Sequence, residues 1–416
     1  MPSQPAAQPD ADTTPPLDTP TPELDFPQFD RPGPFDPPEA FTELRGRCPV
    51  APAKLPSGQT SWLLTSFEGV RTALSDPRFS SDMSRPGFPN LYAKPVDPVL
   101  KGTFIRMDGE DHMFYRRMLI GEFSVKRVEA MRPVVTRITD EALDRLTAAG
   151  PGADLVEHVA LVVPSRVICH VLGVPHSDHA SFADLLQTLF DASSDRDQIN
   201  AAKQGLVSYL DNLVTDREQH DRDDLLGRLV RGHLVTGELT RQEVLTIAWM
   251  LLAAGHETTA HMIGLGTAAL LRHPDQLDLL RREPQLLPRA VDELLRYLTV
   301  MQLGMTRVAV ADAEVDGRTV AAGEGVVALL ALANRDPAVF ERPDELDIRR
   351  DARRHLAFGY GPHQCLGHTL ARLELEVVFG RLLERFPALR LADGEADLEL
   401  RREAIVYGVS RLAVDW

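Results

Sequence analysis

One long helical segment near the middle of the chain constrains the fold most. Thr240-Arg-Gln-Glu243 has the pattern of a capping box, in which the threonine caps the first turn and the glutamate reaches back to it. Apolar residues at helical spacing continue to about Arg272, just before His273-Pro274. At about 1.5 Å per residue, such a helix would be about 50 Å long and would cross a whole domain. We therefore expect one large domain built around it.

The centre of this segment carries polar residues where a core helix would be apolar. The run is Ala254-Gly255-His256-Glu257-Thr258-Thr259. Buried polar side chains need hydrogen-bond partners, so these residues need a reason to be there. Glycine weakens a helix, and a threonine hydroxyl can bond to the carbonyl four residues earlier, which opens the helix locally. We interpret Glu257 and Thr258 as candidates for chemistry and His256 as a core or pocket histidine.

Helical spacing dominates the rest of the chain, and the strand signals are short. Five further segments carry apolar residues three and four apart: Ser124–Ala149, Val156–Leu172, Ile199–Arg217, Asp223–Arg231 and Gln276–Tyr297. Strand-like patterns lie at Ser61–Leu64, Thr306–Val315 and Arg318–Val327, and a further small strand pair is expected within Glu403–Val414. A turn at Asp316–Gly317 separates the second and third of these. The pattern predicts a mainly α fold with minor β.

Composition divides the chain into a tail and one domain. Residues 1–35 are rich in proline and acids and lack apolar periodicity, so we expect a disordered tail followed by a single domain at residues 36–416. A formal net charge of -16 argues against a general nucleic-acid binder. The longest apolar stretch, Ile247–Gly255, is too short to cross a bilayer, and no targeting segment is evident. We expect a monomeric cytoplasmic protein with no membrane partner.

The loop Phe358–Gly367, which reads Phe-Gly-Tyr-Gly-Pro-His-Gln-Cys-Leu-Gly, carries the strongest chemical signal. Glycines and a proline favour a tight loop, and Cys365 lies at the start of a helical segment, Leu366–Phe386. A thiolate there gains from the positive end of the helix. Phe358 can shield the sulfur, and Gly367 lets the backbone approach a flat cofactor. Zinc would need several closely spaced Cys or His ligands, and three cysteines make no disulfide framework.

This loop resembles the haem-binding loop of cytochrome P450 enzymes, whose pattern is Phe-x-x-Gly-x-x-x-Cys-x-Gly. Phe358, Gly361, Cys365 and Gly367 match its fixed positions. The resemblance extends over about residues 41–416, and within the family it is to soluble, actinobacterial-type members. It implies the family fold, which is a triangular helical prism with a long central helix and small β-sheets. It also implies haem b bound through the Cys365 thiolate, and monooxygenase activity.

An acid–arginine pair and an acid–threonine pair also match the family. Glu293 and Arg296 are three residues apart on a helix and so share one face. The resemblance implies that this pair is buried, that Arg342 is its third partner and that the group has a structural role. On the central helix, Glu257 and Thr258 resemble the acid–threonine pair that delivers protons on the distal side of the haem, with Glu257 as the relay from solvent.

The two propionates of a haem need cationic partners, and arginine binds carboxylates as a bidentate fork. His112 and Arg116 match the family's His-x-x-x-Arg helix. Arg307 and His363 match its anchoring arginine and histidine. His355 is a weaker candidate.

The resemblance implies that electrons come from a ferredoxin with an NAD(P)H-dependent reductase. Candidates for a basic docking patch near the cysteine are Arg116, Arg117, Lys126, Arg353, Arg354 and Arg372, although Arg116 would face the haem instead. The residues that resemble a substrate pocket are mostly apolar: Phe88, Leu91, Tyr92, Met250, Ala254, Leu303 and Val406. They favour a lipophilic substrate, such as a polyketide, macrolide, terpenoid or drug-like compound.

Three alternatives stay open from the sequence. Peroxide-driven peroxygenases of this family typically lose the acid–threonine pair, which is present here. A non-catalytic haem sensor would have no use for that pair. An enzyme that couples or rearranges its substrate without inserting oxygen would keep every residue named so far.

Overall fold

The central helix is present as expected. The computed structural model describes residues 23–91, 99–190, 195–392 and 398–416. Helix α10 (Arg241–Arg272) runs for 32 residues without a break, and both hydrogen bonds of its capping box at Thr240 and Glu243 are formed. It ends at His273, directly before the proline that begins α11 (Pro274–Arg282). The sequence prediction of this helix is therefore confirmed at both ends.

Most of the other described elements are also helices. The longer ones are α2 (Phe67–Ser75), α3 (Gly109–Ile120), α5 (Arg132–Ala149), α6 (Val162–Leu172), α7 (His179–Phe190), α8 (Arg196–Gln219), α12 (Leu287–Leu298) and α14 (His368–Arg385). The shorter ones are α1 (Glu39–Leu44), α4 (Val125–Ala130), α9 (Leu225–Leu229) and α13 (Leu330–Ala333). Single turns of 3-10 helix lie at Phe104–Arg106, His176–Asp178, Pro284–Leu286 and Gly361–His363, and π turns lie at Val156–Ala160 and Val230–Leu234.

The strands form one mixed sheet and three small ones. The large sheet has the order β1 (Leu24–Asp25), β2 (Val50–Lys54), β3 (Thr60–Leu64), β9 (Gly325–Ala328), β6 (Met305–Ala309), β4 (Phe79–Ser80). The small sheets join β10 (Arg390–Leu391), β13 (Ala413–Asp415) and β5 (Ala153–Asp154), then β11 (Glu399–Leu400) and β12 (Val409–Arg411), then β7 (Ala313–Val315) and β8 (Arg318–Val320).

The predicted turn between the last two strands is a tight hairpin. Val315 pairs with Arg318, so Asp316 and Gly317 are the two loop residues, and both have positive φ. The strand pair expected within 403–414 is corrected in its pairing. Strands β12 and β13 both lie there, but each pairs with a different strand.

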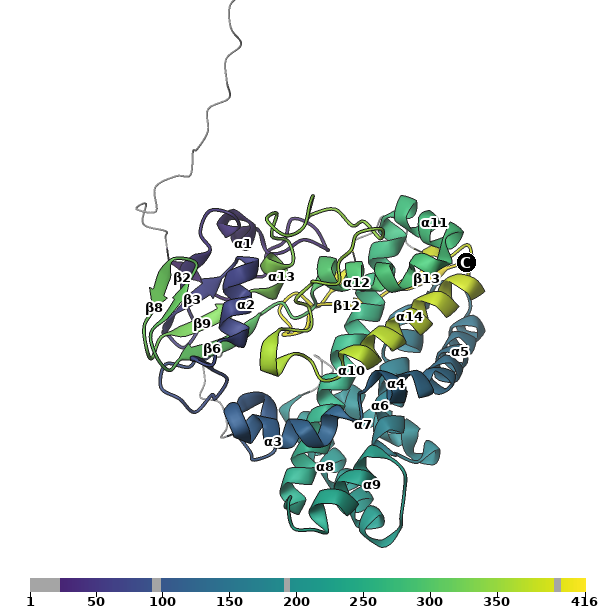
Figure 1. Ribbon diagram of the computed structural model, residues 1–416. Helices are drawn as coiled ribbons and strands as arrows, with labels where there is room; N and C mark the ends of the chain where they lie inside the picture. The colour runs from purple at the N-terminus through teal and green to yellow at the C-terminus, as the bar shows by residue number, and fades with distance from the viewer. Residues whose placement is uncertain (1–22, 92–98, 191–194, 393–397) are drawn as a thin grey trace, which may run out of the picture.

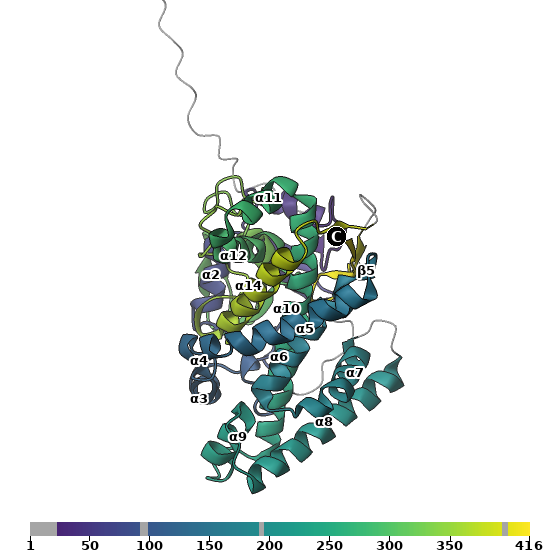
Figure 2. The ribbon, with the colours of Figure 1, turned by 90° about the vertical axis from the view of Figure 1, so that its right-hand side faces the viewer.

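Figure 1 shows how the parts meet. The large sheet lies with α1 and α2 on one side of the molecule, α5, α12 and α14 lie on the other, and α10 passes between them. Figure 2 shows the second view, in which α7 and α8 lie side by side below α5 and α6. Helix α10 packs against α6, α8, α12 and α14, and its apolar residues belong to the largest core cluster. A helix surrounded in this way places its middle turns deep inside the domain.

Several predicted helices are interrupted in the structure. The segment 276–297 divides at Glu283-Pro284, because proline lacks the N–H that a continuous helix needs. The segment 124–149 divides at Met131, directly before the Arg132-Pro133 start of α5. The segment 156–172 begins with a π turn before α6. In the part of the chain that the structure describes, no helix is long and apolar enough to span a bilayer.

The expected N-terminal tail, residues 1–35, is folded over its last part. Residues 24–25 form β1, which pairs in parallel with β2, and Phe26 is buried against Phe41. The expectation of disorder was wrong for residues 23–35. Proline-rich, acidic composition predicts disorder where a segment has nothing to bury, but three phenylalanines of this segment, Phe26, Phe29 and Phe35, pack against the core. Residues 1–22 lie outside the described part.

Candidate active site

Cys365 lies in a tight loop before α14. Gly359 and Gly361 have φ of 69° and 70°, which suits glycine. A side chain at Gly361 would lie 2.6 Å from the Leu74 backbone oxygen of α2, so the loop rests closely on that helix. The Cys365 backbone N–H donates to the Phe358 oxygen at 2.8 Å. Because α14 begins only at His368, Cys365 precedes the first turn rather than starting it.

The setting of Cys365 differs from that of a core cysteine. Cys169 is buried, and burial raises the pKa of its thiol to about 12. The Cys365 side chain is accessible, and a side chain added at Gly367 would meet no atom within 4 Å. Surrounding protein raises the pKa of the Cys365 thiol, while the Gly367 backbone and the charges of Arg116 and Arg372 lower it. An incoming flat group could therefore reach this sulfur.

Residues around the loop hold its shape. The Arg116 guanidinium donates to the Gln364 oxygen at 2.7 Å. The Arg372 guanidinium lies 4.7 Å from the centre of the Phe358 ring and also bonds to Asp292 at 2.8 Å. His355 is buried 3.4 Å from Asp292, so it belongs to this supporting network.

Two predicted histidines and one predicted arginine come together beside the loop. The His112 and His363 rings stack with their centres 4.0 Å apart. Burial, followed by nearby arginines, lowers the pKa of His112 to about 4 and that of His363 to about 3, so both are neutral at pH 7. Arg307 is buried beside them, and burial and the charge of Arg106 lower its pKa to about 10. It remains charged at neutral pH.

Sequence reasoning missed three members of this cluster. Arg106 donates to the Thr306 hydroxyl at 3.5 Å and faces the charge of Arg307. The Ser81 hydroxyl lies 3.1 Å from His363 Nε2. The Ser81 backbone N–H donates to the Asp108 carboxylate at 2.8 Å. Arg106 lies six residues before His112, and an isolated arginine in a loop carries no signal of its own.

On α10, Thr258 behaves as its position predicts. Its hydroxyl donates to the Ala254 oxygen at 3.0 Å, four residues earlier. The helix nevertheless continues through this turn, so the expected local opening is limited to this bond. Gly255 has a packing role, because a side chain there would lie 3.1 Å from Ile168 of α6. Ala254 and Thr258 are accessible in the middle of a core helix, on a face that is free to receive a ligand.

Glu257 is held from outside its helix. Arg401, near the C-terminus, donates to a Glu257 oxygen at 3.2 Å and also contacts His261 Nε2. Burial raises the pKa of Glu257, and Arg401 partly offsets that rise. Glycine at position 408 lets the C-terminal segment pass close to the His261 ring, because a side chain there would lie 2.4 Å from that ring. His261 could have been suspected from its position one turn after Glu257, whereas nothing in the sequence pointed to Arg401.

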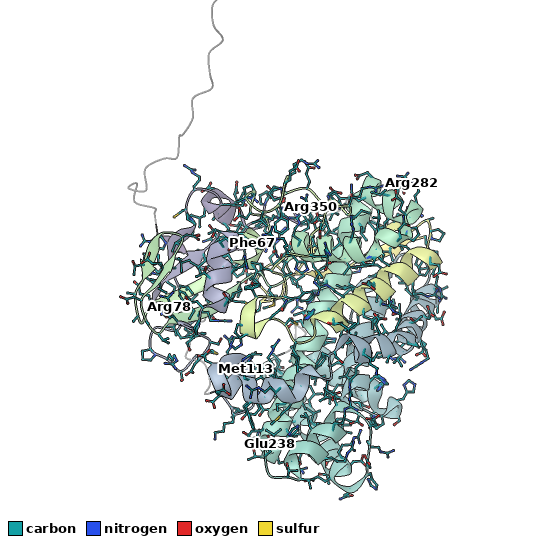
Figure 3. The ribbon with its side chains drawn as sticks, in the orientation of Figure 1. Phe67, Arg78, Met113, Glu238, Arg282 and Arg350 are labelled. Atoms are coloured by element: carbon teal, nitrogen blue, oxygen red, sulfur yellow. The ribbon has the colours of Figure 1, made fainter. Side chains whose placement is uncertain are left out.

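The Glu293–Arg296 pair is buried as expected, but its third partner is not Arg342. Arg296 Nε donates to Glu293 at 2.7 Å, and both side chains are fully buried. Arg350, labelled in Figure 3, donates to Glu293 at 3.1 Å. Arg342 has a φ of 45°, which turns its backbone oxygen toward Arg350 while its exposed side chain pairs with Glu345. Arg342 is therefore corrected to a surface residue.

The buried acid–arginine group supports the cysteine loop from a distance. Arg296 also donates to the backbone oxygens of Asn334, Pro343 and Glu345. The Asn334 side chain in turn accepts from the Leu356 N–H at 2.6 Å, two residues before Phe358. The group thus fixes the segment that leads into the loop.

The expected pocket residues are spread over separate packing clusters. Met250 and Val406 belong to the large core, Leu303 belongs to a smaller cluster with Leu91 at its edge, and Phe88 is also buried. Val406 forms a β-bridge with Met301. Tyr92 lies outside the described residues. The predicted pocket residues Leu303 and Val406 therefore lie on adjacent segments.

The expected basic patch is partly neutralised. Arg353 pairs with Asp351, Arg117 lies 3.6 Å from Glu110, and Arg372 bonds to Asp292. Lys126 and Arg354 are exposed.

Comparison with known proteins identifies the family. The model of the family described as cytochrome P450 matches residues 181–408. Cytochrome P450-SU2 of Streptomyces griseolus is 46% identical over 94% of this chain and 97% of its own. The chain belongs to the cytochrome P450 family. It is a cytochrome P450 monooxygenase, and the fold seen here is the family fold.

Further relatives of this P450 point the same way. Mycinamicin VIII C21 methyl hydroxylase of Micromonospora griseorubida is 43% identical over 91% of this chain and 96% of its own. The crystal structure of CYP105N1 from Streptomyces coelicolor A3(2) matches with a TM-score of 0.89 and 43% identity, over 95% of this chain and 99% of that one. Similarity to these relatives extends over nearly the whole chain.

The residues present fit the haem that the family implies. His112 Nε2 is buried, and no hydrogen-bond partner reaches it among the described residues. Beside it, the buried Arg307 interacts with the charges of Arg106 and Asp108. A cluster with this excess of donors and positive charge suits two propionates, and the accessible thiol of Cys365 suits the iron.

Proposed function

We propose that this P450 inserts one oxygen atom into a lipophilic small molecule, by hydroxylation or epoxidation. The molecule is a secondary metabolite of the polyketide, macrolide or terpenoid type, or a xenobiotic. Overall, dioxygen, two electrons, two protons and the substrate give the oxygenated product and water. Haem b, when bound through Cys365, supplies the chemistry that activates dioxygen. The electrons come from a ferredoxin and its NAD(P)H-dependent reductase.

The observation that carries the proposal is the intact acid–threonine pair on α10. The Thr258 hydroxyl is held by the Ala254 oxygen on an accessible face of the helix. Glu257 is half-buried and bonded to Arg401, so it lies between solvent and the helix interior. A threonine that orients a donor and an acid that exchanges protons with solvent are what a two-proton reaction needs. Neither a peroxide-driven enzyme nor a haem sensor needs both.

The relatives' names support the substrate class. Proteins 44%, 43% and 42% identical to this chain are named vitamin D3 dihydroxylase, mycinamicin VIII C21 methyl hydroxylase and pentalenic acid synthase. These names point to a sterol-like, a macrolide and a terpenoid molecule. The apolar candidates Phe88, Leu91, Met250, Leu303 and Val406 suit such molecules.

The test is a titration of the haem-loaded protein with vitamin D3 and mycinamicin VIII, read as a spin-state shift of the Soret band. Turnover is then compared with ferredoxin, reductase and NAD(P)H against turnover with hydrogen peroxide. We expect a shift with at least one compound, and oxygenated product with the electron donors. Product from peroxide alone would favour a peroxygenase. A coupled product without added oxygen would favour oxidative coupling, and no shift with any lipophilic compound would favour a sensor.

A further inference from the structure

The folded N-terminal segment, residues 23–36, has a specific contact with the far end of the chain. We call it the N-terminal strap. Arg31 Nη2 donates to the Gln302 side-chain oxygen at 2.8 Å. The same guanidinium lies 4.0 Å from the centre of the Tyr407 ring. The Tyr407 hydroxyl returns to the strap by donating to the Pro34 oxygen at 2.8 Å. One arginine thus links three segments that are far apart in sequence.

Gln302 and Tyr407, the two partners of Arg31, lie on segments that are hydrogen-bonded to each other. The Gln302 side chain donates to the Arg402 oxygen at 2.8 Å and contacts the Ala404 oxygen. The Tyr407 N–H donates to the Val300 oxygen at 2.8 Å. Gln302 and Tyr407 are both buried. Arg31 therefore lies where the segments 300–303 and 402–407 pair, on the side covered by the strap.

These two segments carry apolar residues assigned above to the substrate pocket. Leu303 directly follows Gln302, and Val406 directly precedes Tyr407. The C-terminal segment also reaches the distal part of α10, because Arg401 bonds to Glu257 and Gly408 lies against His261. The wall formed by 300–303 and 402–407 therefore lies next to the proton-delivery residues.

An apolar substrate cannot orient such a wall by itself, because hydrophobic contact is non-directional. A hydrogen bond to a charged group and a cation–π contact are both directional. Holding a binding surface in shape before the ligand arrives lowers the entropy lost on binding. Burial lowers the pKa of Arg31 to about 10, so it still carries the charge that both contacts need at neutral pH.

We infer that Arg31 is a positioning residue for substrate specificity: it clamps segment 300–303 against segment 402–407 and so shapes the apolar wall that a large lipophilic substrate contacts. The inference rests on the proposed function only in taking this wall as part of the substrate pocket.

The test uses the full-length haem-loaded protein with Arg31→Ala, the conservative Arg31→Lys, and Arg47→Ala as the matched control. Arg47 is an exposed arginine of the same N-terminal region. Hydrogen–deuterium exchange is measured on peptides covering 300–304 and 402–408. Affinities are measured for imidazole, a small ligand of haem iron, and for vitamin D3, a large lipophilic probe.

We expect Arg31→Ala to speed exchange about tenfold in both peptides and to weaken vitamin D3 binding by a similar factor, as the loss of about 1.4 kcal/mol would. Imidazole affinity should stay within about twofold, because a purely local wall leaves the iron site intact. Arg31→Lys should lie between, because it keeps the charge without the planar fork. Arg47→Ala should match the wild type.

Unchanged exchange in Arg31→Ala would overturn the clamp, whatever the ligands do. Faster exchange with unchanged vitamin D3 affinity would overturn the specificity role. Equal loss of imidazole and vitamin D3 affinity would show general damage to the haem pocket and would also overturn it. If Arg31→Ala does not fold, Arg31→Lys and Tyr407→Phe, which removes the bond to Pro34, decide by the same readouts. A wild type that does not bind vitamin D3 would count against the proposed substrate class, while the exchange result would still decide the clamp.

Discussion

Two carboxylates on helices are bonded to arginines from distant parts of the chain, and they differ in nearly every other respect. Glu293 is fully buried and accepts from Arg296, Arg350 and the Asp347 N–H. Glu257 is 21% exposed and accepts one bond, at 3.2 Å, from an arginine that it shares with His261. The first carboxylate is saturated, whereas the second has acceptor capacity left.

This difference in hydrogen bonding distinguishes a fixed structural group, which we call the lock, from a carboxylate that is free to exchange protons, which we call the relay. A buried carboxylate held by four hydrogen bonds cannot change protonation or position without a large cost. A partly exposed carboxylate with one long bond can do both, and burial raises the pKa of Glu257. The same residue types therefore support the cysteine loop at one site and, under the proposed function, serve proton delivery at the other.

The largest effect is expected at the saturated group. Arg350→Ala removes one of the cations from Glu293 and leaves a buried carboxylate under-compensated. We expect the free energy of unfolding to fall by about 3 kcal/mol, measured by denaturant unfolding of the haem-loaded protein. A loss below about 0.5 kcal/mol would show that this group is not a lock.

The next effect concerns the residue beside the relay. Thr258→Ala removes the hydroxyl that donates to the Ala254 oxygen. We expect the fraction of NAD(P)H that ends in product to fall at least about tenfold, with more peroxide released and little change in stability. Thr258→Ser keeps a hydroxyl and should retain most of the coupling. Equal coupling in the alanine variant and the wild type would remove Thr258 from proton delivery.

A moderate effect is expected from Arg401→Ala. Arg401 favours the ionised form of Glu257, so its loss raises the pKa of that carboxyl further. Proton uptake from solvent needs the ionised form, and coupling therefore declines as pH falls through this pKa. The acidic limb of the coupling–pH profile should move to higher pH. Arg411→Ala, an exposed arginine of the neighbouring strand β12, is the matched control and should leave the limb unmoved. A limb that stays in place, or moves down, in Arg401→Ala would argue against the relay.

The smallest effect is expected at Arg342. Its side chain is exposed and paired with Glu345, although its backbone oxygen faces Arg350. Arg342→Ala should change the free energy of unfolding by no more than about 0.5 kcal/mol. Denaturant unfolding beside Arg350→Ala gives the comparison directly. Similar losses in the two variants would restore Arg342 as a member of the lock.

Features that depend on neighbouring residues could be predicted from the sequence, whereas pairings between distant residues could not. The capping box of α10, the hairpin at Asp316 and the cysteine loop each depend on residues within a few positions of one another. Partners from elsewhere are 57 residues apart for Arg350 and Glu293, 144 for Arg401 and Glu257, and 271 for Arg31 and Gln302.

The error at Arg342 shows why such pairs escape prediction. Arg342 and Arg350 are eight residues apart; Arg350 bonds to Glu293, whereas Arg342 pairs with Glu345 and only its backbone oxygen accepts from Arg350. The N-terminal strap escaped for a related reason. Its composition resembles a disordered tail, and only the partners Gln302 and Tyr407 give Arg31 a place to bind.

The central claim is that a haem bound by the Cys365 thiolate is the catalytic centre of this P450. The most direct measurement is the carbon monoxide difference spectrum of the reduced, haem-loaded protein, beside Cys365→His and Cys169→Ser. We expect the red-shifted Soret band of thiolate ligation in the wild type and in Cys169→Ser, and its replacement by a histidine-type band in Cys365→His. A histidine-type band in the wild type, or a red-shifted band that survives in Cys365→His, would contradict the claim.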